Sequence, residues 1–198
     1  VIAGLASLGA AEYQEGRTEE AGRRYQQALD LLQRAADEGT EAILRNNLGL
    51  VRQSAGDVGR AEQLFRQAIA LNQAAGHPAA EASNHVNLGI LAEERREYEV
   101  AEREFERALE LDKVAERRAE IADDLLRLGR VAERRGFPDR GLAYSERAYR
   151  SHLAQGNQPQ AIAALTFALD CARRLGLVAE VARFEKELNG LARASSGR

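Results

Sequence analysis

The residues best suited to catalysis in this chain are three histidines and a single cysteine, namely His77, His85, His152 and Cys171. None of them has a second histidine or cysteine at the spacing that metal ligands require, so the sequence predicts no metal site. Serine, cysteine and histidine also do not combine into a set that could activate a nucleophile. We therefore predict a protein that is not an enzyme and needs no cofactor, with Cys171 as a small core residue.

Side-chain amides form a second group of residues that could recognise a ligand. Asn46, Asn47, Gln53 and Asn87 fall on one face of predicted helices, and Asn47 and Asn87 occupy equivalent positions in successive units of a repeat. Each amide offers a donor and an acceptor. A row of amides therefore suits the backbone of an extended peptide, whose N–H and C=O groups alternate. The alternative is that these asparagines cap or bridge neighbouring helices.

Arginines form a third group, further along the chain. Arg127, Arg130 and Arg134 follow one another on one predicted helical face, and Arg173 lies on the equivalent face of the next unit. Because guanidinium groups match carboxylates in bidentate geometry, we expect these arginines to hold an acidic part of the peptide. The alternative is pairing within the protein, for which the same region supplies Asp123, Glu133 and Asp170.

The elements that must position these residues repeat at a constant spacing of about 40 residues. The pair Leu-Gly recurs at this spacing as Leu8-Gly9, Leu48-Gly49, Leu88-Gly89 and Leu128-Gly129. In the second unit, Ala61, Phe65 and Ala68 follow on a second predicted helix, so that a large side chain fills the space between small ones. A repeat this regular is typical of a solenoid.

The sequence predicts an all-α fold, a right-handed superhelical solenoid of five helix-turn-helix units. Residues 1–194 are predicted to form this single solenoid, with residues 195–198 as a tail or expression scar. The units are expected at about 1–38, 39–77, 78–115, 116–156 and 157–194. The predicted helices are Ile2–Gln14, Thr18–Asp37, Glu41–Ser54, Val58–Ala75, Ala79–Arg95, Glu97–Leu111, Arg117–Arg135, Pro138–Gln155, Pro159–Leu175 and Val178–Ala194.

The turn inside each unit is marked by a glycine, except in the third unit. Gly16, Gly56, Gly136 and Gly176 are equivalent, and Arg96 occupies the remaining position. We expect Arg96 to adopt the left-handed conformation that glycine adopts easily, at a strain of roughly 1–2 kcal/mol. The boundary between units 3 and 4, residues 112–120, contains neither glycine nor proline, but the register predicts a turn there as well.

The chain resembles the tetratricopeptide repeat family through Leu48, Gly49, Gly56, Ala61, Phe65 and Ala68 and their equivalents. Because the units exceed the usual length of about 34 residues, the chain is more similar to kinesin light chains, Pins-type adaptors and bacterial signalling regulators. The resemblance implies a concave groove lined by the first helix of each unit. It also implies that Asn47 and Asn87 hold the backbone of a bound peptide.

Composition limits the partners that we expect. The net charge is −3 with both signs interspersed, which argues against nucleic-acid binding. No apolar segment approaches the length of about 20 residues that a membrane span requires, and no signal peptide is visible, so a cytoplasmic location is expected. The predicted partner is a protein or peptide. The alternative function is a self-associating scaffold, or a docking region of a larger signalling protein, in which an apolar solenoid end with Val1, Ile2 and Leu5 pairs with a second copy.

Overall fold

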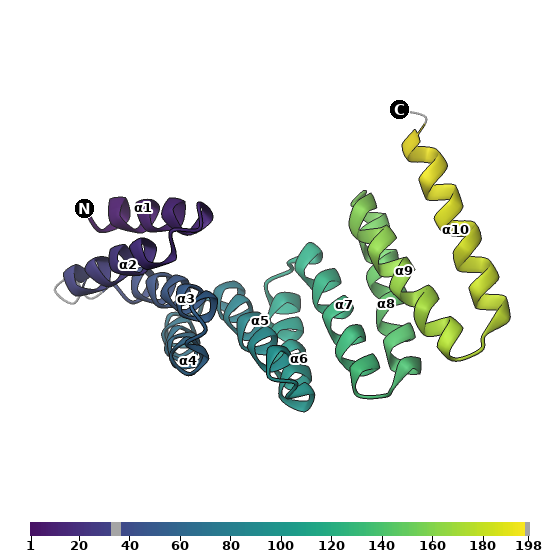
Figure 1. Ribbon diagram of the computed structural model, residues 1–198, viewed down its shortest axis with the longest axis horizontal. Coiled ribbons are helices and arrows are strands. Elements are labelled where there is room, and N and C mark those ends of the chain that lie inside the picture. The colour runs from purple at the N-terminus through teal and green to yellow at the C-terminus, as the bar shows by residue number, and fades with distance from the viewer. Residues whose placement is uncertain (33–36, 197–198) are drawn as a thin grey trace. The chain divides into compact units, whose positions relative to one another are not determined.

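The computed structural model describes residues 1–32 and 37–196, and in this part of the chain every regular element is an α-helix (Figure 1). The ten helices described are α1 (Ile2–Gln14), α2 (Thr18–Leu32), α3 (Glu38–Ser54), α4 (Val58–Ala75), α5 (Pro78–Glu94), α6 (Tyr98–Val114), α7 (Arg118–Arg134), α8 (Pro138–Ala154), α9 (Gln158–Arg174) and α10 (Val178–Ser196). These helices match the predicted ones in number and order.

Two helix ends differ from the prediction by three residues: α6 ends at Val114 rather than at Leu111, and α3 begins earlier. Helix α3 starts at Glu38 rather than at Glu41, because the Asp37 side chain accepts a hydrogen bond from the backbone N–H of Thr40 at 3.0 Å. Asp37 is therefore a helix cap rather than the last residue of the preceding helix. The rest of that predicted helix end, residues 33–36, lies outside the described residues. At the other end of the chain α10 continues to Ser196, two residues beyond its predicted end.

The turns within the units have the predicted backbone conformation. Gly56 has φ 77°, and Arg96 has φ 61°, as its place in the register predicts. The turn expected between units 3 and 4 is also present, and Glu116 with φ 54° takes the glycine position there. The backbone N–H of Glu116 bonds to the Lys113 carbonyl, and that of Arg117 to the Asp112 carbonyl at 2.9 Å, which ends α6 as a glycine would.

The core shows why small and large residues alternate. Ala61, Phe65 and Ala68 are completely buried on α4. A Cβ atom added at Gly49 would lie 2.6 Å from Cε1 of Phe65, so only glycine lets the ring fit against α3. The equivalent ring in the third unit, Phe105, is likewise fully buried.

The chain divides into two compact units: residues 1–95 contain α1 to α5, and residues 96–198 contain α6 to α10. Within each unit, helices pack mainly against their neighbours in sequence, as expected for a stack of repeats. Among the described helices, none is long and apolar enough to cross a membrane.

Candidate functional site

Asn46 is the centre of an amide cluster that joins α3 to α5. Its Oδ1 accepts hydrogen bonds from Nδ2 of Asn84 at 2.8 Å and from Nδ2 of Asn87 at 2.7 Å. Its own Nδ2 donates to Oδ1 of Asn47 at 3.2 Å. Asn46 therefore does what the bridging alternative predicts, because its amide is largely occupied inside the protein.

The cluster continues into the core through two residues that the sequence reasoning missed. Nδ2 of Asn72 on α4 donates to Oδ1 of Asn84 at 2.8 Å, and both side chains are buried. A signal for them was available in the repeat. The equivalent positions in the preceding unit are Leu32 and Leu44, so a pair of asparagines replaces a pair of leucines at this helix contact. A polar pair at two apolar positions indicates a buried hydrogen bond.

The cluster leaves one donor and one acceptor on its exposed side. Asn47 uses its Oδ1 to accept from Asn46, and its Nδ2 has no partner among the described residues. Asn87 uses its Nδ2 to donate to Asn46, and its Oδ1 has no partner in the same set. Both residues are half-buried. The fixed orientation of Asn46 thus determines that Asn47 presents an N–H group and Asn87 presents a C=O group.

Gln53, the fourth predicted amide, is engaged within the protein. Its Nε2 donates to Oε1 of Glu94 at 2.7 Å, which joins the ends of α3 and α5. The hydroxyl groups of Tyr13 and Ser54, 2.7 Å apart, make an equivalent connection between α1 and α3. Gln53 therefore serves the contact between repeats.

The four predicted arginines divide into two pairs. Nη1 of Arg127 lies 3.1 Å from Oδ1 of the buried Asp124, and Nη2 of Arg173 lies 2.7 Å from Oε1 of Glu185 on α10. Arg130 and Arg134 are exposed on α7 and have no ion pair among the described residues. Arg134 also lines a hollow of about 340 Å³ together with Phe167 and Asp170.

The acidic residues that could have paired with these arginines have other partners, or weaker contacts. Asp123 lies 3.3 Å from Nε2 of the buried His152 on α8, and Glu133 pairs with Arg174. Asp170 is 3.8 Å from Arg173, whose closer partner is Glu185.

Two buried carboxyl groups have pKa values raised above the ordinary range of aspartate. Asp112 on α6 and Asp124 on α7 are 2% and 0% exposed. Burial, together with the neighbouring charge of Asp112, raises the pKa of Asp124 to about 7, although Arg127 opposes this. Burial also raises the pKa of Asp112, against the effect of Arg117. The pair belongs to the joint between α6 and α7 and not to a solvent-filled hollow.

Cys171 is fully buried on α9, which confirms its predicted place in the core. Burial raises the pKa of its thiol to about 11, so the thiol stays protonated and unreactive at neutral pH. Within the described part of the chain, no group of three or more histidine, cysteine or acidic residues is placed to hold a metal ion.

A family model for the tetratricopeptide repeat matches residues 1–74 and 40–113. No curated protein matches the sequence. Among solved structures, BtubC (BKLC) from P. vanneervenii is 18% identical with a TM-score of 0.87, and the match covers 98% of this chain and 80% of that one. These findings confirm the predicted all-α solenoid fold.

Two further structures show the same fold. A Podosopora anserina protein described as a kinesin light chain with nearly identical TPR-like repeats is 13% identical with a TM-score of 0.80, covering 98% of this chain and 96% of that one. A Rap protein complexed with Competence and Sporulation Factor is 16% identical with a TM-score of 0.72, covering 96% of this chain and 53% of that one.

Proposed function

Because this chain belongs to the tetratricopeptide repeat family, whose fold is generally a non-enzymatic scaffold for protein–protein interaction, we propose that it binds an extended peptide segment of a partner protein. The observation that carries the proposal is the complementary pair formed by Asn47 and Asn87. One side chain presents an N–H donor and the other a C=O acceptor, and both are held in place through Asn46.

The donor and the acceptor suit a peptide backbone in particular. An extended peptide has one C=O and one N–H group per residue, so it can satisfy both asparagines whatever its side chains are. Ile43 lies one turn before Asn47 on α3 and is 58% exposed, which offers an apolar contact for a peptide side chain. Asn46 and Gln53 position this surface, whereas Asn47 and Asn87 contact the peptide.

We also propose that an acidic part of the peptide binds to α7. Arg130 and Arg134 are exposed and have no ion pair among the described residues, so both guanidinium groups remain available for carboxylates. Arg127 and Arg173, which hold Asp124 and Glu185, contribute positive charge rather than direct contacts. The Rap protein of similar fold, which is complexed with Competence and Sporulation Factor, supports a role in binding a partner.

The test starts from a peptide selected on an array of extended, acidic sequences. Asn47→Ala and Asn87→Ala should each weaken binding about fivefold, because each removes one net hydrogen bond of about 1 kcal/mol. Asn189→Ala, which changes an exposed asparagine on α10, is the control and should bind like the wild type. Fluorescence anisotropy gives the dissociation constants, and unchanged binding by the double variant would contradict the proposal.

Self-association is a second candidate function, favoured by apolar side chains exposed on α1. Val1 is 96% exposed and Leu8 is 42% exposed, whereas Leu48, the equivalent of Leu8, is buried. A second copy of the chain could cover this apolar surface. The two candidates use different residues, since Leu8 belongs to α1 and Val1 directly precedes it, whereas Asn47 and Asn87 belong to α3 and α5.

A further inference from the structure

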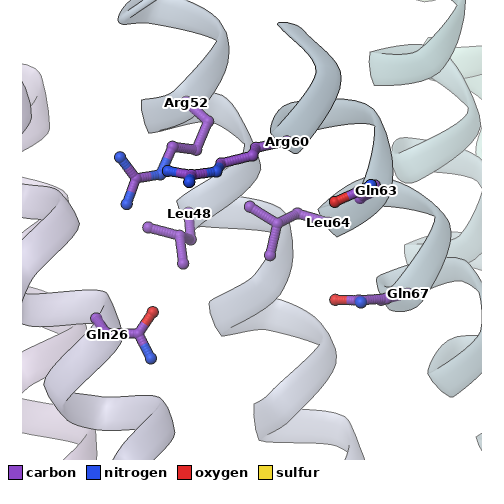
Figure 2. A pocket seen from close by; sticks show the side chains of 7 residues that line it. All are labelled: Gln26, Leu48, Arg52, Arg60, Gln63, Leu64 and Gln67. Carbon is purple, nitrogen blue, oxygen red and sulfur yellow. The ribbon is translucent and has the colours of Figure 1, made fainter. Parts of the chain in front are cut away.

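A second hollow lies on the other side of α3, among α2, α3 and α4 (Figure 2). Its volume is about 300 Å³, within the range of small ligand sites. Leu48 and Arg52 line it from α3, and they are one turn apart on the face that packs toward α4. Asn47 and Asn46 point away from this face, because they precede Leu48 by one and two residues and each residue turns an α-helix by about 100°. The hollow is therefore separate from the proposed peptide surface.

The lining contains positive and amide groups and no carboxylate. Arg52 and Arg60 extend over the same part of the hollow, with Gln63 and Gln67 on one side and Gln26 on the other (Figure 2). The protein as a whole has a net charge of −3. The hollow has two guanidinium groups and no acid in its lining, so it is locally positive on a protein with a negative net charge. It therefore attracts anions.

Arg52 lacks the counter-ion that most arginines of this region have. Arg45, two turns before Arg52 on the same face of α3, pairs with Glu41, and Arg66 pairs with Glu62 at 2.9 Å. Arg52 is half-buried and has no ion pair among the described residues. Arg60 is largely exposed, and its Nε lies 3.4 Å from Asp57, which leaves the two terminal nitrogens of its guanidinium group available.

The amides complete a set of hydrogen-bond donors. Oε1 of Gln67 accepts a hydrogen bond from Arg45, which fixes the orientation of the amide. Its NH₂ group has no acceptor among the described residues and can donate to a ligand. Leu48 and Leu64 supply an apolar floor beneath the charged groups. Donors above an apolar floor fit a carboxylate carried on a short aliphatic stem.

We propose that this hollow binds the carboxylate of a glutamate side chain from an acidic protein segment. The guanidinium groups of Arg52 and Arg60 hold the two oxygens, Gln67 donates a further hydrogen bond, and the methylene groups lie on Leu48 and Leu64. This second site goes beyond the proposed peptide surface and does not depend on it. A partner that reaches both faces of α3 would gain affinity from the combined contacts.

The test uses N-acetyl-glutamate N-methylamide as the probe and the corresponding glutamine compound as its neutral match. Both are titrated at low salt into the ¹⁵N-labelled protein while the side-chain Nε–H resonances of arginine are recorded. The resonances of Arg52 and Arg60 should shift saturably with the glutamate probe, at least tenfold more tightly than with the glutamine probe. Arg52→Gln should weaken this binding at least tenfold. Arg66→Gln, on the same helix as Arg60 but outside the hollow, should not change it.

Three results would overturn the proposal. The first is equal binding of the two probes, which would show an apolar site without charge recognition. The second is unchanged binding in both Arg52→Gln and Arg60→Gln; because Arg60 is exposed, its variant remains informative even where Arg52→Gln fails to fold. The third is tighter binding of inorganic phosphate than of the glutamate probe, which would assign the hollow to phosphate groups instead.

Discussion

Asp112 and Asp124 are two carboxyl groups buried next to each other where α6 meets α7. The charged groups facing them are Arg117, Glu120 and Arg127, of which Glu120 adds a further negative charge near Asp112. Burial makes the ionised forms unfavourable, and two neighbouring negative charges do so further. The folded protein therefore retains a proton here at pH values at which an exposed aspartate has lost it.

This proton makes stability depend on pH in a defined direction. The pKa of Asp124 is about 7 in the folded chain and 3.8 for an unperturbed aspartate. A raised pKa stabilises the folded state fully below the lower value, and this stabilisation is lost as the pH rises through the higher one. In Asp124→Asn, the free energy of unfolding should decrease less between these two pH values than it does in the wild type. At pH 8 the free energy of unfolding of the variant should be higher than that of the wild type by about 1–3 kcal/mol.

Urea unfolding followed by circular dichroism at several pH values measures this effect. Asp170→Asn, which changes an exposed carboxyl group on α9, is the control and should keep the wild-type slope. A slope that Asp124→Asn leaves intact would show that the buried pair does not retain the proton.

Gly49 gives a second prediction for a single residue. Gly49→Ala would place a Cβ atom 2.6 Å from the ring of Phe65, and the closely packed core should lose about 1–3 kcal/mol of stability. Gly59→Ala is the matched control on α4, where an added Cβ meets no atom within 4 Å. It should stabilise the helix by about 0.5–1 kcal/mol. Chemical denaturation distinguishes the two, and equal effects would contradict the packing role of Gly49.

At the scale of the helices, the register of the repeat was a better guide than local turn signals. Glu116 and Arg96 end their helices with positive φ although neither is glycine, and only the constant spacing of the repeat predicted these turns. Helix α3 began earlier than expected, because capping by Asp37 depends on one local hydrogen bond that the repeat does not contain. Periodicity therefore predicts where helices lie, whereas their ends depend on individual side chains.

The candidate site was harder to predict than the helices. The face that carries Asn47 and Asn87 follows from periodicity, but the direction of each amide depends on hydrogen bonds between α3 and α5. Similarly, Asp123 and Asp124 both lie one turn before Arg127, but Arg127 pairs with Asp124, whereas Asp123 lies near His152 on α8. Such choices between adjacent residues require coordinates in addition to a pattern.

Glu116 has a positive φ at the end of α6, and we expect this conformation to be strained for a residue with a Cβ atom. Glu116→Gly should raise the free energy of unfolding by up to about 1 kcal/mol, because glycine adopts this conformation without a Cβ clash. Lys113→Gly, within the last turn of α6, should instead lower it by about 1 kcal/mol through lost helix propensity. Thermal unfolding measures both variants, and a loss of stability in Glu116→Gly would contradict the strain.

At the scale of the whole molecule, the exposed apolar side chains of α1 predict self-association. Light scattering at several concentrations should show a mass above that of the single chain, and Leu8→Asp should restore the monomer, because a buried charge opposes association. Leu153→Asp changes a similarly exposed leucine on α8 and serves as the control. A monomer at every concentration would leave peptide binding as the remaining candidate function.

The repeats have the same arrangement of helices, but the two buried side chains that occupy equivalent positions where successive repeats meet differ from one junction to the next. Equivalent positions hold Leu32 with Leu44, Asn72 with Asn84, Asp112 with Asp124, and His152 with Ala164. Asn72 has its hydrogen-bond partner Asn84 only at its own junction, and Asp112 lies beside Asp124 only at theirs. Exchanging these two repeats would therefore bury an amide or a carboxyl group against an apolar side chain. The buried pairs thus encode the serial order of the repeats, and repeats that are shuffled or duplicated will assemble only when both members of a pair move together.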